Sequence, residues 1–286
     1  MRWLALAVLG LTAPTSAEGR FASFGGARVY FESYGEGDEA IVLVHGWAAD
    51  AGIWRFQVPA FEKQFRVITL DLPGHGRSDA PERFSYDQAQ LADSIEAVLR
   101  GAGVRRAVVV GHSMGAHVAV VFQQRHPDRV VGLALIDGFL RAPPPSPRHL
   151  ALMAAFESRD FQTAMAAFID SMMVPNTPEW IRLEAQRVAR QTPYHVVLRA
   201  AKGLHRSRQP RLRRIHVPVL ALMALTADSP KNQERWFRWR VDDCDYRVWA
   251  NSSHFMMMEE PERFNRVVLD FANRAWRANP PSGPTR

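Results

Sequence analysis

The sequence predicts an α/β fold with a mostly parallel central sheet flanked by helices. Two observations predict it: short runs rich in Val, Ile and Leu are typical of strands buried on both faces, and helical patterns alternate with these runs. Such alternation favours parallel strands joined by crossover helices. A third observation, a break in the alternation at about residue 138, predicts a helical cap inserted into this core.

The expected strands cover residues 40–44, 66–70, 107–110, 130–136, 217–225 and 246–250, and the expected core helices cover 86–99, 114–124, 232–239 and 261–277. Between 139 and 214 the pattern is helical only, with segments near 148–157, 159–173, 178–190 and 193–203. We therefore expect three parts besides the N-terminus: a core of residues 18–138 and 215–278, a helical lid at 139–214 and a flexible tail at 279–286.

Residues 1–17 have the pattern of a secretory signal peptide. Arg2 supplies a positive charge, nine nearly all-apolar residues follow at 3–11, and small residues stand at 15 and 17. We expect cleavage after Ala17 and a periplasmic or secreted protein. Because a membrane-spanning helix needs about 20 apolar residues, no transmembrane segment is expected once this peptide is removed.

Composition excludes several other classes of protein. The chain has 286 residues, 47% apolar and 23% charged, which argues against wholesale disorder. Its one cysteine, Cys244, excludes an internal disulfide framework and a cysteine-based zinc site. No His, Asp and Glu cluster has metal-ligand spacing, so neither a metal nor another cofactor is expected. The net charge of +7 could suggest nucleic acid, but no binding motif accompanies the arginines, and nucleic acid is not expected as a partner.

The strongest functional signal follows the strand at 107–110. The chain there reads Gly111-His112-Ser113-Met114-Gly115 and then enters a helix. Gly-x-Ser-x-Gly at a strand-to-helix junction is typical of a nucleophile elbow, a strained turn that exposes the serine hydroxyl. A side chain on either flanking glycine would crowd that turn. The motif predicts Ser113 as a nucleophile.

A serine nucleophile needs a base and an orienting acid. His254 follows the strand at 246–250, and loops at the carboxyl ends of parallel strands are where such sheets place their sites. The acid is expected between serine and histidine in the chain. Asp228, after the strand at 217–225, is the first choice, and Asp137, at the end of the strand at 130–136, is the main alternative. Further alternatives are Asp242, Asp243 and Asp245.

Three more segments accompany the elbow. They are Val44-His45-Gly46-Trp47, Asp71-Leu72-Pro73-Gly74-His75-Gly76-Arg77-Ser78, and His254-Phe255 followed by Glu259-Glu260-Pro261-Glu262-Arg263-Phe264. With these motifs the chain resembles the α/β-hydrolase family with a helical lid, over about residues 25–137 and 215–275. The resemblance implies an α/β-hydrolase fold, and its motifs are specific to the superfamily but not to a substrate.

The resemblance also implies roles for individual residues. Ser113 is similar to the family's nucleophile, His254 to its base and Asp228 to its acid, and the backbone N–H groups of Trp47 and Met114 correspond to the oxyanion hole. The family usually has a glycine shortly before the acid, whereas residues 223–227 contain none, which keeps the choice of acid open. A serine at the elbow, in place of aspartate, argues against the haloalkane dehalogenase and epoxide hydrolase branches. His45 and His75, in family loops, are expected to be structural.

The expected function is that of a serine hydrolase, which cleaves a carboxylic ester with an apolar part through an acyl-enzyme. Its partner is then a small-molecule substrate. The alternatives are hydrolysis of a lactone, an amide or a C–C bond beside a ketone, or a ligand-binding protein with little turnover. Apolar side chains of the insertion are expected to pack and in part to wall an acyl pocket, to which residues 256–258 could add: Met153, Phe156, Phe161, Met165, Phe168, Met172 and Met173. The sequence specifies no oligomeric state.

Overall fold

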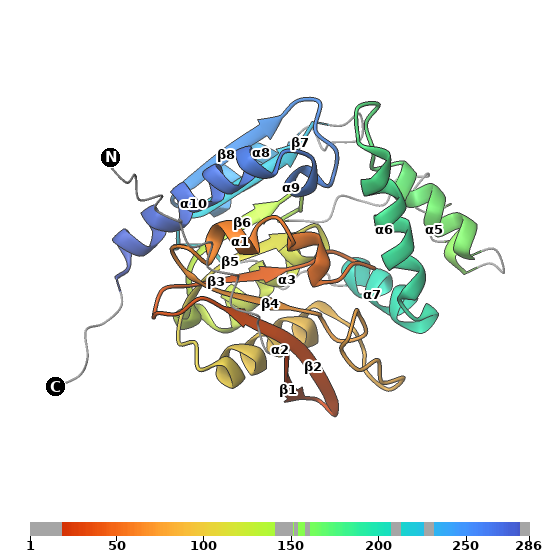
Figure 1. Ribbon diagram of the computed structural model, residues 1–286, viewed down its shortest axis with the longest axis horizontal. Coiled ribbons are helices and arrows are strands. Elements are labelled where there is room, and N and C mark those ends of the chain that lie inside the picture. Colours follow the sequence, from red (N-terminus) through yellow and green to blue (C-terminus); the bar gives the residue numbers. More distant parts are fainter. Residues whose placement is uncertain are drawn as a thin grey trace, which may run out of the picture.

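A computed structural model describes residues 19–140, 151, 154–157, 161–206, 213–225 and 232–280 of the chain. In these residues, eight strands form one sheet in the order β1-β2-β4-β3-β5-β6-β7-β8 (Figure 1). Their bounds are β1 Arg20–Phe24, β2 Ala27–Tyr34, β3 Ala40–Val44, β4 Arg66–Leu70, β5 Ala107–His112, β6 Val130–Ile136, β7 Val219–Ala224 and β8 Cys244–Trp249.

The sheet is mostly parallel, which confirms the predicted fold class. From β4 through β3, β5, β6 and β7 to β8 every neighbouring pair is parallel, whereas β1 pairs with β2 and β2 with β4 in antiparallel fashion. The register places Ile136 of β6 opposite His112 of β5 and Leu222 of β7. The carboxyl ends of these three strands therefore meet at one edge of the sheet.

The hairpin β1–β2 is an addition that the sequence patterns did not indicate. Only one residue of β1, Ala22, is fully buried, so the strand has no apolar run to reveal it. The turn is formed by Gly25 and Gly26, whose φ angles are 55° and 81°. Two consecutive positive φ values suit the tight turns that join antiparallel strands, and glycine adopts them without steric cost.

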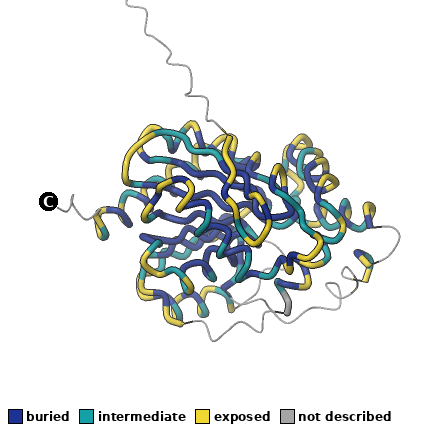
Figure 2. The backbone as a smooth tube through the Cα atoms, turned by 90° about the horizontal axis from the view of Figure 1, so that it is seen from below, coloured by how far each residue is buried: buried dark blue, intermediate teal, exposed yellow. Residues whose placement is uncertain are grey.

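Helices cover both faces of the sheet. One face packs against α2 (Gln88–Ala102), α3 (Met114–Arg125) and α8 (Gln233–Arg240), and the other against η1 (Ala51–Trp54), α1 (Val58–Phe61), α9 (Met256–Glu259) and α10 (Pro261–Ala278). A short turn, η2 (Pro127–Arg129), joins α3 to β6. Alternate residues of β3 join the two apolar clusters, Val42 on one face and Leu43 on the other. Burial on both faces explains the continuous apolar runs, and Figure 2 shows the strands buried through the middle of the molecule.

The helices α5 (Phe161–Asp170), α6 (Glu179–Gln191) and α7 (Tyr194–Arg206) lie between β6 and β7 in the chain. They lie together on one side of the sheet, at the right of Figure 1 in green and teal. They share a small apolar cluster, which also takes in Ala48 from the loop after β3: its buried members are Ala48, Phe156, Phe161, Met165, Ile169, Ala189 and Val197. The inserted helices thus have a core of their own that contacts the main domain.

The two chain ends fall largely outside the described residues. Residues 1–18, which include the expected signal peptide, and residues 281–286 of the expected tail belong there. Across the part of the chain that the structure covers, no helix combines the length and the apolar character needed to cross a bilayer.

Candidate active site

Ser113 occupies the sharp turn between β5 and α3. Its backbone has φ 54° and ψ −118°, a conformation that L-residues adopt only under strain. The turn is held by the Ser113 N–H, which donates to the Ile136 carbonyl of β6 at 2.8 Å. The side chain is half-buried at the carboxyl edge of the sheet. This is the geometry of a nucleophile elbow.

The two glycines of the elbow are required by close backbone contacts. A Cβ on Gly111 would overlap the carbonyl oxygen of Gly115, and it would lie 2.7 Å from the Ala116 Cα. A Cβ on Gly115 would overlap the carbonyl oxygens of Val44 and His45. Each neighbour is backbone, which cannot rotate away. Glycine is therefore needed at position 111 because the two ends of the elbow are in contact, and at position 115 because the elbow packs against the end of β3.

His254 is paired with a carboxylate of β6. Its Nδ1 donates to Oδ2 of Asp137 at 2.6 Å, and both side chains are mostly buried, with exposed fractions of 14% and 18%. The other oxygen of Asp137, Oδ1, accepts from the Ala224 N–H at 3.0 Å, and the Asp137 N–H donates to the Leu222 carbonyl at 2.8 Å. The carboxylate is thus fixed by the neighbouring strand β7, and it fixes one ring nitrogen of His254.

Asp137, the main alternative for the acid, is the carboxylate that the structure places on His254. The first choice, Asp228, lies outside the described residues. Two further alternatives bond elsewhere: Asp242 pairs with Arg214 and His216, and Asp245 pairs with Arg247 and Arg274. Asp243 accepts a backbone bond from Val219 at the start of β7.

His112 connects the elbow to the histidine loop. Its Nε2 donates to the His254 carbonyl at 2.8 Å, and the two rings lie 4.5 Å apart between centroids. The His254 N–H in turn donates to the Met172 carbonyl at 3.2 Å. Burial lowers the pKa of His112 well below its usual range, with the neighbouring His254 as a second cause, so the ring is neutral. The sequence placed His112 beside the nucleophile, but its bond to the His254 backbone has no signal in the sequence.

His45 orients the loop that follows β3. Its Nδ1 donates to the Gly46 carbonyl at 2.7 Å, and its Nε2 accepts from the Leu72 N–H at 2.9 Å. Burial is the main cause that lowers the pKa of His45, which suits a neutral ring with one donor and one acceptor nitrogen. Since C=O and N–H point in opposite directions across a trans peptide, fixing the Gly46 carbonyl also fixes the direction of the Trp47 N–H.

The Gly46 loop passes close to the elbow. A Cβ built on Gly46 would lie 3.1 Å from the Cβ of Ser113 and 3.0 Å from Nδ1 of His112. Among the described residues, no acceptor is bonded to the backbone N–H of Trp47 or to that of Met114, the first residue of α3. Two unpaired N–H groups beside a serine are what an oxyanion hole requires.

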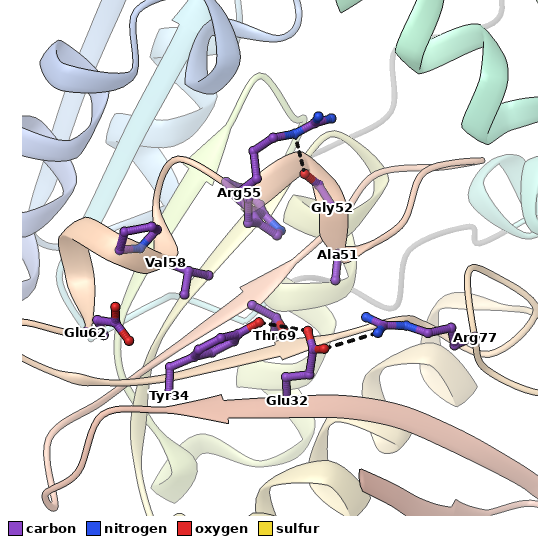
Figure 3. A pocket seen from close by; sticks show the side chains of 11 residues that line it. Glu32, Tyr34, Ala51, Gly52, Arg55, Val58, Glu62, Thr69 and Arg77 are labelled. Carbon is purple, nitrogen blue, oxygen red and sulfur yellow. Dashed lines mark hydrogen bonds and ion pairs between the residues drawn. The ribbon is translucent and has the colours of Figure 1, made fainter. Parts of the chain in front are cut away.

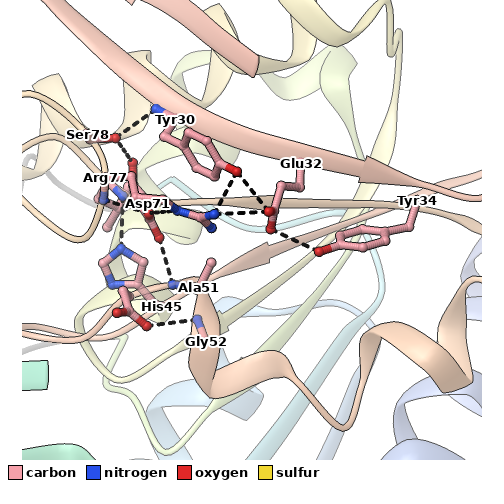
Figure 4. Close-up of polar contacts among 11 residues, drawn as sticks. Tyr30, Glu32, Tyr34, His45, Ala51, Gly52, Asp71, Arg77 and Ser78 are labelled. Carbon is pink, nitrogen blue, oxygen red and sulfur yellow. Dashed lines mark hydrogen bonds and ion pairs between the residues drawn. The ribbon is translucent and has the colours of Figure 1, made fainter. Parts of the chain in front are cut away.

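A buried carboxylate joins this loop to the loop after β4 (Figure 4). Asp71 accepts from the Ala51 N–H at 2.8 Å and from the Arg77 N–H at 2.9 Å. The Ser78 hydroxyl donates to the Asp71 carbonyl and accepts from the Tyr30 N–H at 2.8 Å. The segment 71–78, which the sequence analysis singled out as a motif, therefore stabilises the loop that carries Trp47 through these hydrogen bonds.

Comparison with known proteins agrees with this geometry. A family model described as the alpha/beta hydrolase fold matches residues 39–171. A 2-hydroxy-6-oxononadienedioate/2-hydroxy-6-oxononatrienedioate hydrolase of Burkholderia vietnamiensis is 30% identical over 263 residues, which cover 86% of this chain and 91% of the relative. The chain belongs to the α/β-hydrolase family. It is an enzyme of the hydrolase class.

Two other similar proteins are esterases. A pimeloyl-[acyl-carrier protein] methyl ester esterase of Yersinia enterocolitica is 28% identical over 87% of this hydrolase and 98% of the relative. A thermophilic esterase of Thermogutta terrifontis superposes with a TM-score of 0.77 at 26% identity, covering 91% of this chain and 99% of the other. The likeness extends over nearly the whole length in each case.

The inserted helices of this hydrolase contact the loop after β3 through Trp47. The Trp47 ring lies 5.2 Å from the ring of Phe156 and 5.4 Å from that of Phe168, and its Nε1 donates to the Val197 carbonyl of α7 at 3.1 Å. Trp47, Phe168, Met172 and Met173 are only partly buried, whereas Phe156, Phe161 and Met165 are buried in the helical cluster. Met153 lies outside the described residues.

Two features singled out in the sequence are buried in this hydrolase. Met256, Met257 and Met258 are buried in the main core beneath α10, so they pack instead of lining a pocket. His75 is fully buried and donates from Nδ1 to the Pro73 carbonyl at 3.1 Å, and burial lowers its pKa to about 3, as expected of a structural residue. Within the described ranges, no group of three or more His, Cys, Asp and Glu side chains could hold a metal ion.

Proposed function

We propose that this hydrolase cleaves a carboxylic ester with an apolar part, using Ser113, His254 and Asp137 as a catalytic triad. The observation that carries the proposal is the 2.6 Å bond from His254 Nδ1 to Asp137 Oδ2. A proton held on Nδ1 leaves Nε2 as the basic nitrogen, which is the tautomer that a serine nucleophile needs.

The reaction follows from the roles of these groups. Ser113 Oγ attacks the ester carbonyl carbon while its proton passes to Nε2 of His254. The negative oxygen of the tetrahedral intermediate accepts hydrogen bonds from the N–H groups of Trp47 and Met114. His254 returns the proton to the leaving alcohol, and an acyl-enzyme on Ser113 remains. Water, deprotonated by His254, then attacks the acyl carbon and releases the acid.

The apolar part of the substrate is proposed from the side chains near the oxyanion loop. Trp47, Phe168 and Met172 lie between the core and the inserted helices, and they are not fully buried. Apolar walls with a few polar groups are typical of pockets for small ligands. We propose residues 139–214 as the lid that carries this wall. The esterase names of two relatives support the choice of an ester.

The test uses the full-length chain and p-nitrophenyl esters of graded acyl length, beside lactones, amides and a ketone with a cleavable C–C bond. Turnover is expected with esters, and Ser113→Ala is expected to lower kcat by about 10⁴-fold or more. A fluorophosphonate should label the wild-type protein and not Ser113→Ala. Faster turnover of another substrate class would replace the ester, and undiminished activity of Ser113→Ala would overturn the assignment of the nucleophile.

We also propose that the chain is exported to the periplasm or the medium after cleavage behind Ala17. The charged, apolar and small-residue regions of residues 1–17 support this proposal. Expression in a bacterium, fractionation and N-terminal sequencing should yield a mature chain that begins at Glu18 in the exported fraction. An intact Met1 or a cytoplasmic product would contradict it.

A further inference from the structure

Two glutamates that follow His254 belong to a motif that the proposed triad does not use. Both of them hold residues 251–255, which we call the histidine loop. Glu259 accepts from the Ser253 N–H through Oε2 at 2.7 Å, and Glu260 accepts from the Ser252 hydroxyl through Oε1 at 2.7 Å. Ser252 and Ser253 are buried, with exposed fractions of 1% and 0%. The chain just before the proposed base is therefore fixed by hydrogen bonds to these two carboxylates.

Glu259 also reaches the insertion. Its second oxygen, Oε1, accepts from the Thr177 hydroxyl at 2.6 Å. Thr177 closes the turn after α5, because its hydroxyl accepts from the Val174 N–H at 3.1 Å and its N–H donates to the Val174 carbonyl at 2.9 Å. A hydrogen bond to a carboxylate is charge-assisted and stronger than one between neutral groups. A single side chain thus joins the histidine loop to residues 171–178, the loop between α5 and α6.

The α5–α6 loop also contacts His254 directly. The Met172 carbonyl accepts from the His254 N–H at 3.2 Å, and the Met172 N–H donates to the Ile169 carbonyl of α5 at 3.0 Å. From the other side, Nε2 of His112 donates to the His254 carbonyl at 2.8 Å. Both backbone polar groups of His254 are therefore bonded, one to the insertion and one to the elbow. A displacement of the insertion would act on the backbone that carries the imidazole.

The helix α9, which ends at Glu259, is fixed to the main domain by Gln57. This side chain is fully buried, and its Nε2 donates to the Met257 carbonyl of α9 at 2.9 Å. Gln57 belongs to the segment η1–α1, which lies over the sheet across a pocket of about 310 Å³, with Val58 on the helical side and Thr69 on the sheet side (Figure 3). Glu259 is therefore held by the core, and the insertion is the partner that it fixes.

We propose that Glu259 and Thr177 are positioning residues, through which the insertion sets the orientation of His254 toward Ser113. The inference rests on the triad proposed above. A general base works only when its nitrogen lies within hydrogen-bond distance of the nucleophile, and small errors in its position slow the reaction. Neither residue touches the reacting atoms: Glu259 acts through the Ser253 N–H, and Thr177 acts through Glu259. The insertion then contributes to the chemical step as well as to the apolar wall.

The test is Thr177→Val in the full-length chain, which keeps the shape of the side chain and removes its hydroxyl. The rate constant for labelling of Ser113 by a fluorophosphonate should fall by about 3- to 10-fold, the effect expected of one hydrogen bond. With esters, kcat should fall by the same factor while KM changes less than about twofold, since the base is disturbed and the apolar wall is not. Thr177→Ser, which keeps the hydroxyl, should react as the wild type does. Labelling of Thr177→Val at the wild-type rate would overturn the proposal.

Glu259→Ala separates the link from a local effect on the turn at 174–177. It removes both bonds of the carboxylate, so labelling should slow by about 10- to 100-fold, and adding Thr177→Val should cause no further loss. Fully additive effects would mean that Thr177 acts without Glu259, against the proposal. Thr192→Val, at the end of α6, makes the same change at another threonine of the insertion and should leave the rate unchanged. A loss as large as that of Thr177→Val would mean that any change in the insertion slows labelling.

The Nδ1–H proton of His254 provides a readout that needs no reaction. A short bond to a carboxylate moves such a proton downfield in a ¹H spectrum, and His254→Asn identifies its signal among those of the ten histidines. In Thr177→Val this proton should exchange with water about 3- to 10-fold faster, because its bond to Asp137 opens more often. A wild type that the fluorophosphonate does not label would refute the triad, and the exchange rate would still decide the role of Thr177. Equal exchange in the wild type and Thr177→Val would show that Thr177 does not position His254.

Discussion

The edge of the sheet and the helices inserted after β6 hold their functional side chains in different ways. At the edge, Ser113 and Asp137 both have positive φ angles, and each N–H is bonded to a carbonyl of the neighbouring strand. In the insertion, the side chains around Trp47 and Phe168 meet in apolar contacts, beside single hydrogen bonds such as the one from Trp47 Nε1 to the Val197 carbonyl. A backbone bond fixes an atom to a fraction of an ångström, whereas apolar packing tolerates exchange of similar side chains. In the function proposed above, the edge carries the chemistry and the insertion carries the choice of substrate.

The largest effect should come from crowding the edge. Gly115→Ala places a methyl group against the carbonyl oxygens of Val44 and His45. We expect it to lower the free energy of unfolding by about 3 kcal/mol or more, and kcat by at least about 100-fold, because both the elbow and the loop after β3 must shift. Urea unfolding and ester kinetics measure the two effects.

A matched glycine provides the control for that substitution. Gly101 lies in α2, and a Cβ there would meet Ala22 at an ordinary distance of 3.4 Å. Gly101→Ala should leave activity unchanged and add up to about 1 kcal/mol of stability, because alanine favours a helix interior. If Gly115→Ala were equally harmless, the edge would not be the rigid part of the molecule.

The buried histidines of the edge should make stability depend on pH. Burial lowers the pKa of His45, His75 and His112 in the folded state, whereas an unfolded histidine titrates near about 6.5. Below that pH the unfolded chain binds protons that the folded chain does not. Stability is therefore full above about pH 6.5 and falls as the pH decreases, by up to about 1.4 kcal/mol per pH unit for each histidine.

His75 allows this dependence to be assigned, because its pKa is lowered to about 3. Between pH 7.5 and pH 5.0, His75→Gln should lose about 2 kcal/mol less unfolding free energy than the wild type, since one proton fewer is taken up on unfolding. Urea unfolding at the two pH values gives the comparison. Equal losses in both proteins would mean that His75 is not held neutral by the fold.

Substitutions where the insertion contacts the core should change the kinetics less than substitutions at the edge of the sheet. Trp47→Phe removes the bond from Nε1 to the Val197 carbonyl but keeps the backbone N–H of residue 47. We expect KM for long-chain esters to rise by about 3- to 10-fold while kcat changes less than about twofold. Trp180→Phe, at an exposed tryptophan of α6, is the control and should change neither. A fall in kcat with constant KM would instead indicate that the Trp47 side chain takes part in the chemical step.

The same contrast explains what the sequence could predict. The apolar runs of β3 and β4 match the structure residue for residue because strands buried on both faces leave a continuous signal. Ser113 carries its own motif, since glycine is needed at both flanking contacts. The sequence patterns did not predict the strand β1, because most of its residues are exposed and leave no apolar run.

The acid could not be chosen from the sequence. Asp137 directly follows β6, and Asp228 comes four residues after β7 in the chain; because β6 and β7 are neighbours in the sheet, strand order alone does not separate the two candidates. What distinguishes Asp137 is its φ of 43° and the bond from Ala224 N–H to its carboxylate. Neither leaves a pattern in the residue types. In the same way, Met256 to Met258 follow His254 closely in the chain, yet they point into the core.

The most direct measurement compares Asp137→Asn with Asp228→Asn in ester hydrolysis. An asparagine at 137 would keep the shape but no longer hold the imidazole in the required tautomer, so kcat should fall by about 10²- to 10⁴-fold at neutral pH. Asp228→Asn should retain kcat within about twofold of the wild type. The opposite result, collapse with Asp228→Asn and near-normal turnover with Asp137→Asn, would contradict the triad of Ser113, His254 and Asp137.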